Sequence, residues 1–116
     1  MKKILGMLAM ALCLIGCSKG PDKVAIAYLE ALADGDFDKA AEYVSKDDTS
    51  AFKKNTSIAL VKNAMKRELD GLKFKVVDTK IDGDKATVKI EGKKDSKSET
   101  NDLKLVKEDG NWKVDL

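Results

Sequence analysis

The stretch LKFKVVDTKIDGDKATVKI, residues 72–90, marks the point where the hydrophobic period of the chain changes. Apolar residues alternate with lysines from Leu72 to Val76, which is typical of a strand that buries one face. The alternation slips by one residue at Val77, and this slip predicts a β-bulge. A turn at residues 82–84 then leads into a second strand. The inner face of that strand is expected to carry Ala86, Val88 and Ile90.

Two further strands are predicted after this pair. The charged segment 92–98 is expected to be a loop, and a third strand with Leu103 and Leu105 on its inner face follows it. Asp109-Gly110 is a tight-turn signal that joins the third strand to a fourth. On the fourth strand the same face should carry Trp112, Val114 and Leu116.

Upstream of residue 72 the apolar residues recur at helical spacing. A first helix should begin at Pro21, which suits the first helical position, and end at Asp34-Gly35. A short second helix follows a cap at Asp36. A polar stretch, 45–57, leads into a third helix that ends at Gly71 and starts somewhere between Ser50 and Ile58. Three helices packed on a curved four-stranded antiparallel sheet make an α+β fold.

The inner face of the predicted sheet is almost entirely apolar, and Thr79 is its one polar residue. The acids of these strands, Asp78, Glu91 and Asp102, fall on the outer phase. Two helix tyrosines could turn a hydroxyl toward an inner pocket, although packing of their rings in the core is the alternative for both. Trp112 could stack on a ligand or pack in the core. The candidate pocket-lining residues are Tyr28, Tyr43, Phe74, Thr79 and Trp112.

The sequence lacks the residues of several common active sites. It has no histidine, which excludes Ser-His-Asp and Cys-His nucleophilic sites and histidine metal ligands. No glycine spacing matches a phosphate-binding loop, and no carboxylate pair for acid–base work stands out. We therefore expect no catalytic residues, no metal site, no cofactor and no enzymatic activity.

The charge of the chain does not favour nucleic acid as a partner. The 22 basic and 20 acidic residues are interleaved, and 20 of each remain when Lys2 and Lys3 are set aside. Arg67 is the one arginine, so bidentate recognition of phosphate is largely absent. A nucleic-acid binder would instead show a basic face.

The N-terminus has the pattern of an export signal, with Lys2 and Lys3 before an apolar segment, 4–15. That segment is well short of the ~20 residues that a membrane-spanning helix needs. The run Leu14-Ile15-Gly16-Cys17 resembles the lipobox of bacterial lipoproteins. An uncleaved anchor or an ordinary signal peptide is the alternative.

The lipobox resemblance implies a lipid anchor. Cys17 would carry a diacylglyceryl thioether, the chain would be cut before it, and the new amine would receive a fatty acid such as palmitate. Ser18 after the cysteine favours the outer membrane if the source is Gram-negative. The expected organisation is a signal peptide over 1–16, a lipidated cysteine and short tether over 17–20, and a domain over 21–116.

Four fragments together resemble a known family. They are PDKVAIAYLEAL (21–32), GDFDKAAEYVS (35–45), GDKATV (83–88) and LVKEDGNWKV (105–114). In this order and spacing they resemble small bacterial lipoprotein domains of unknown function in the nuclear transport factor 2-like (NTF2-like) superfamily, also described as a cystatin-like cone. The resemblance implies a curved sheet that wraps a long helix and leaves a pocket. The superfamily includes isomerases, dehydratases and binding proteins, so the fold alone leaves the function open.

Three functional hypotheses remain. The first is a non-catalytic domain, held at the cell envelope by lipid on Cys17, that binds an envelope protein or a small apolar ligand. The second is an isomerase or hydrolase that uses the cone pocket. The third is a structural component of an envelope complex, which an exposed apolar patch on the outer sheet face would favour. The lysines on that face count against the third hypothesis.

The anchor can be tested in cells. Cys17→Ser should leave the precursor uncleaved and without lipid, because the thiol is the site of attachment. Metabolic labelling with a radioactive fatty acid measures this, with Cys13→Ser as the control that should still be labelled. Wild-type protein without label would contradict the anchor.

Overall fold

The computed structural model describes residues 20–116 and has an α+β fold. The predicted signal peptide and Cys17 lie outside the described residues. Helices come first, then four strands that form one antiparallel sheet in the order β1-β2-β3-β4, which confirms the predicted class and sheet. The elements are α2 (Pro21–Ala33), α3 (Phe37–Glu42), α4 (Lys46–Thr56), α5 (Ala59–Leu69), β1 (Lys73–Asp82), β2 (Lys85–Lys94), β3 (Lys97–Glu108) and β4 (Asn111–Val114).

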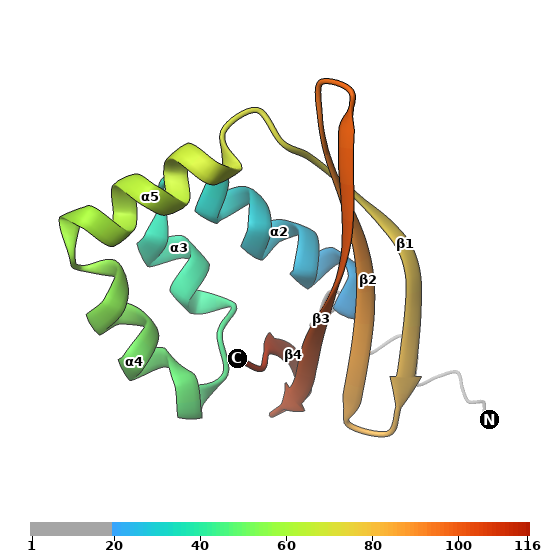
Figure 1. The fold of residues 1–116 in the computed structure, drawn as a ribbon. Coiled ribbons are helices and arrows are strands. Elements are labelled where there is room, and N and C mark those ends of the chain that lie inside the picture. Colours follow the sequence, from blue (N-terminus) through green and yellow to red (C-terminus); the bar gives the residue numbers. More distant parts are fainter. Residues whose placement is uncertain (1–19) are drawn as a thin grey trace.

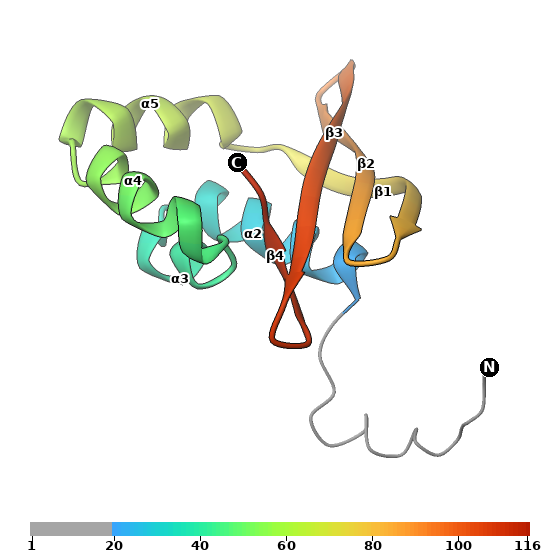
Figure 2. The same cartoon turned by 90° about the horizontal axis from the view of Figure 1, so that it is seen from below.

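The helices lie on the concave side of the curved sheet (Figures 1 and 2). Helix α2 runs beside the strands, and α3, α4 and α5 lie beyond it. The β2–β3 hairpin extends past the helices at one end of the molecule (Figure 1). The sheet is therefore covered over only part of its inner face.

Helix α2 forms the centre of the core. Gly20 is its extended N-cap, Pro21 occupies the first turn, and Gly35 leaves the helix with φ +77°, a conformation that glycine adopts without strain. One face of the helix is buried against the sheet and α3. Its buried residues are Pro21, Val24, Ala25, Tyr28, Ala31 and Leu32.

The part of the chain that the structure describes has four helices, where three were expected. The polar stretch 45–57 forms a helix of its own, α4, rather than a lead into the next one. Acids in the first turn and Lys53 and Lys54 in the last turn match the helix dipole. Only Phe52 and Thr56 are buried, so the apolar pattern was too sparse to show helical period.

The bulge in β1 is confirmed. The register passes from Val76↔Ile90 to Asp78↔Lys89, so that Val77 has no partner on β2. Because of this extra residue, the inner phase continues at Thr79, opposite the buried Val88. The inner face carries the sheet's share of the core, which consists of Ala86, Val88, Ile90, Leu105, Trp112 and Val114.

The predicted loop at 92–98 is wrong, because β2 and β3 continue to Lys94 and Lys97 and meet in a two-residue turn. Asp95 takes φ 56° there, a left-handed conformation that aspartate tolerates better than most residues. The alternation of inner-face and outer-face residues therefore continues through the charged segment. As a result, four polar residues lie on the inner face of the sheet, namely Lys94, Lys97, Glu99 and Asn101.

The closing hairpin is tight, as predicted. Asp109 and Gly110 have φ 51° and 83°, the left-handed pair of a turn that matches strand twist. Leu116, expected on the inner face, is 59% exposed because β4 ends at Val114. Trp112 is 7% exposed, and the Nζ atom of Lys107 lies 5.4 Å from the centre of its ring.

Trp112→Ala should lower the free energy of unfolding by ~3–5 kcal/mol, because truncation leaves a cavity in the core. Urea melts of protein that begins at Ser18 measure this, since every buried core residue lies between Val24 and Val114. Lys107→Ala is the control, and loss of its ring contact should cost only about 0.5–1 kcal/mol. An unchanged midpoint for Trp112→Ala would place the ring outside the core.

Candidate functional site

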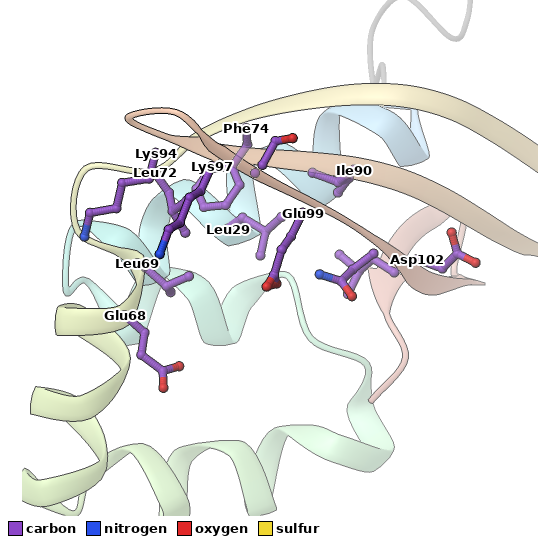
Figure 3. Close-up of a pocket in the computed structure, with 14 residues that line it drawn as sticks. Leu29, Glu68, Leu69, Leu72, Phe74, Ile90, Lys94, Lys97, Glu99 and Asp102 are labelled. Atoms are coloured by element: carbon purple, nitrogen blue, oxygen red, sulfur yellow. The ribbon is translucent and has the colours of Figure 1, made fainter.

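A hollow of about 450 Å³ opens between α2, α5 and the projecting β2–β3 hairpin (Figure 3). Its volume lies within the ~300–1,000 Å³ of small-molecule sites. One wall is apolar and is built from both helices, the α5–β1 connection and three strands. The residues of this apolar wall are Leu29, Leu69, Leu72, Phe74, Ile90 and Leu103.

The other wall is polar and comes mainly from the hairpin. Lys94 pairs in register with Lys97, and one step further in Gly92 pairs with Glu99. Figure 3 shows the two lysines at one end of the hollow and Glu99 further along β3. Glu68 joins them from α5. The hollow thus has both signs of charge beside an apolar surface.

These charges have no ionic partners within residues 20–116. The one ion pair of that region joins Lys46 to Asp109 at 4.0 Å, and neither of these residues lines the hollow. The four side chains of the polar wall, Lys94, Lys97, Glu99 and Glu68, are exposed and make no hydrogen bond to other described residues. They are free to contact a ligand.

Gly92 lines the hollow and adds no side chain to it. Its backbone does not need glycine, since its φ is not positive. A methyl group there would lie 3.6 Å from Cδ2 of Leu72 and 3.8 Å from the ring of Phe74, which are ordinary contacts. A glycine inside a strand often marks a place where a ligand or another chain approaches closely.

The five residues predicted to line a pocket do not lie together in one site. Phe74 lines the hollow, and Tyr28 lines a second one of about 370 Å³ beside α4 and α5. The remaining three candidates, Tyr43, Thr79 and Trp112, line neither.

Sequence reasoning missed the polar wall because segment 92–98 was assigned to a loop. Extending the alternation forward from Ile90 and backward from Leu103 would have placed Lys94, Glu99 and Asn101 on the inner face. Asp102 keeps its predicted outer phase, in register with Lys89, although it borders the hollow. In Figure 3 its carboxylate lies away from that of Glu99.

Two further properties concern residues 20–116 only. No three histidine, cysteine, aspartate or glutamate side chains in this range come close enough together to hold a metal ion. None of its helices combines the length and the hydropathy that crossing a membrane requires.

Among the titratable groups of residues 20–116, the Tyr28 phenol is the one whose pKa is clearly shifted. Its side chain packs in the core, with its ring centre 6.1 Å from that of Phe52, and burial raises the pKa of the phenol to about 12. The phenol therefore stays neutral to a higher pH in the folded state than in the unfolded state. Its contribution to the free energy of unfolding is fully present below pH ~10 and is lost as pH rises toward 12.

Tyr28→Phe should therefore reduce the alkaline loss of stability. Two pKa units correspond to about 2.7 kcal/mol, so the variant should gain up to that amount on wild type between pH 10 and 12. Urea melts at pH 7, 10 and 11.5 measure the difference, and comparison with wild type removes the effect of lysine titration. Parallel pH profiles for the two proteins would show that the Tyr28 phenol is solvated.

Comparison with solved structures shows the fold. A Campylobacter jejuni protein, described provisionally as an NTF2-like transpeptidase, matches with a TM-score of 0.68 and 18% identity, covering 84% of this chain and 99% of its own. A SEC-C motif protein from Rhodopseudomonas palustris matches with a TM-score of 0.59 and 14% identity over 90% of this chain and 84% of its own. A de novo designed NTF2-fold protein matches with a TM-score of 0.54 and 14% identity over 85% and 86%.

These identities are low, so the likeness establishes the NTF2-like fold and leaves the activity open. No curated protein gives a significant match to the sequence. Residues 15–115 match the family described as a domain of unknown function, DUF4878. The chain is therefore a member of the DUF4878 family, with an NTF2-like α+β fold.

Proposed function

We propose that this protein is a lipid-anchored component of the bacterial cell envelope whose NTF2-like domain binds a small, largely apolar ligand without transforming it. The observation that carries the proposal is the apolar wall of the hollow. Six side chains from separate elements converge there around a space of small-molecule size. Apolar surface exposed in this way favours a ligand that covers it, at about 25 cal/mol per Å².

Binding is favoured over catalysis by the setting of the carboxylates. Glu68 and Glu99 border the same hollow, which is the feature that an isomerase or hydrolase would use. Both carboxylates are exposed to solvent. Carboxyl groups that act as general acids or bases are usually shielded from water, which tunes their pKa to the reaction.

The anchor would place this site near a membrane. With lipid on Cys17, only residues 18–20 separate the bilayer from the start of α2, and three extended residues span ~10 Å. Ser18 favours the outer membrane in a Gram-negative cell. Ligands would then come from the membrane or from molecules that pass close to it.

An envelope protein is the second candidate for the bound partner. Helix α5 buries none of its residues, and Ile58 and Leu60 beside α4 are 49% and 75% exposed. Exposed apolar residues of this kind favour a protein contact when they form a continuous patch.

Filling the hollow tests the ligand-binding proposal. Gly92→Leu should weaken binding of the neutral fluorophore Nile red about ten-fold, because the new side chain occupies roughly 55 Å² of apolar contact, or 1.4 kcal/mol. Gly92→Ala should have a smaller effect, since its methyl group makes ordinary contacts. Fluorescence titration of protein that begins at Ser18 measures the affinities.

The matched control is Thr87→Leu, which adds apolar surface to the opposite face of the same strand. Urea midpoints show whether each variant is folded. Equal affinity for wild type, Gly92→Leu and Thr87→Leu would show that Nile red binds outside the hollow. If the folded wild-type protein shows no saturable binding of Nile red, the ligand-binding proposal is wrong.

A further inference from the structure

The polar wall has a fixed order of charges along the hairpin. Lys94 and Lys97 face each other next to the turn, Glu99 comes one inner-face step further in, and Asn101 another step beyond. Each step along one face of a strand covers two residues, ~6.6–6.8 Å. The positive end and the negative group are therefore one step apart along the hairpin, and the amide lies a second step beyond.

The apolar wall runs parallel to this series. Gly92 lies opposite Glu99 in the register, and Leu72 and Phe74 approach it within contact distance of an added methyl group. Ile90, the next inner residue of β2, is buried and lies opposite Asn101. A ligand in the hollow would thus contact charges with one edge and hydrocarbon with the other.

The lysine pair favours an anion. Like charges directly opposite each other on neighbouring strands repel, so Lys94 and Lys97 destabilise this end of the hairpin. An anionic group between them would relieve that repulsion, and a lysine ammonium binds phosphate well as a point charge. Glu99 and Glu68, on the same hollow, instead favour a cation and disfavour a purely anionic ligand.

We propose that the hollow binds an amphiphile with a zwitterionic head group of the phosphoethanolamine type. The phosphate would lie between Lys94 and Lys97, the ammonium beside Glu99, and a single hydrocarbon chain along the apolar wall. This inference rests on the proposed function and specifies its ligand class. One head group of this kind satisfies both signs of charge that the described residues leave without partners.

Four probes with the same alkyl chain test the head group, each below its micelle concentration. They are an alkyl phosphoethanolamine, an alkyl phosphate, an alkylammonium and a neutral alkyl glucoside. Isothermal titration with protein that begins at Ser18 should give the zwitterionic probe an affinity about ten-fold above the glucoside, at about three-fold for the phosphate and about three-fold for the ammonium. Free phosphoethanolamine, which lacks a chain, should bind far more weakly.

Charge-neutralising variants assign the contacts. Lys94→Gln with Lys97→Gln should remove the advantage of the phosphate, and Glu99→Gln should remove that of the ammonium. Lys93→Gln and Glu91→Gln are the matched controls, because they remove the same charges from the outer face of β2, one of the two strands of this hairpin. Both controls should keep the preference of wild type.

Four results would overturn the inference. Equal affinity for all four probes would show that the hollow binds the alkyl chain and does not select the head group. An alkyl phosphate that binds as tightly as the zwitterion, with no effect of Glu99→Gln, would indicate an anionic ligand. Free phosphoethanolamine that competes as well as its alkyl form would indicate a soluble compound. If no probe binds, the glucoside included, the proposed function fails as well.

Discussion

The packing of α2 against the inner face of the sheet is the contact on which the molecule depends. Tyr28 and Leu32 of α2 and Val88 and Leu105 of the sheet are buried in one core. Residues 20–116 contain no cysteine, so no disulfide can replace this burial. Stability in a domain of about 100 residues then rests on side-chain packing, and a single truncated core residue removes a large part of it.

The hollow beside the hairpin follows from where that packing stops. Along β3 burial falls from Leu105, which is fully enclosed, through the half-buried Leu103 to the exposed Asn101. The helices cover the lower part of the hairpin, and the upper part continues beyond them (Figure 1). A sheet longer than the helix that covers it leaves inner-face positions without helical neighbours. Polar side chains are tolerated there, and they can serve recognition instead of stability.

Most of the fold was predictable from the sequence, because burial of one strand face forces alternation. The slip at Val77 predicted the bulge, and the caps around Pro21 and Gly35 predicted the limits of α2. The length of the β2–β3 hairpin was not predictable in this way, since exposed strands carry the same charged residues as loops. Helix α4 was missed for a related reason, because its stability comes from its end charges and only two buried side chains. The polar wall of the site was lost with the hairpin, while Phe74 on the apolar wall was found.

The bulge in β1 also bears on how copies of this protein behave side by side. β1 is an edge strand of ten residues, and an unprotected edge of that length can pair with another chain. Lys73, Lys75 and Lys80 place charge along it, and the unpaired Val77 interrupts its regular hydrogen bonding. Tethering to a membrane would confine the domains to two dimensions, where encounters between edges are frequent. The irregular, charged edge would keep such crowded domains from joining into continuous sheets.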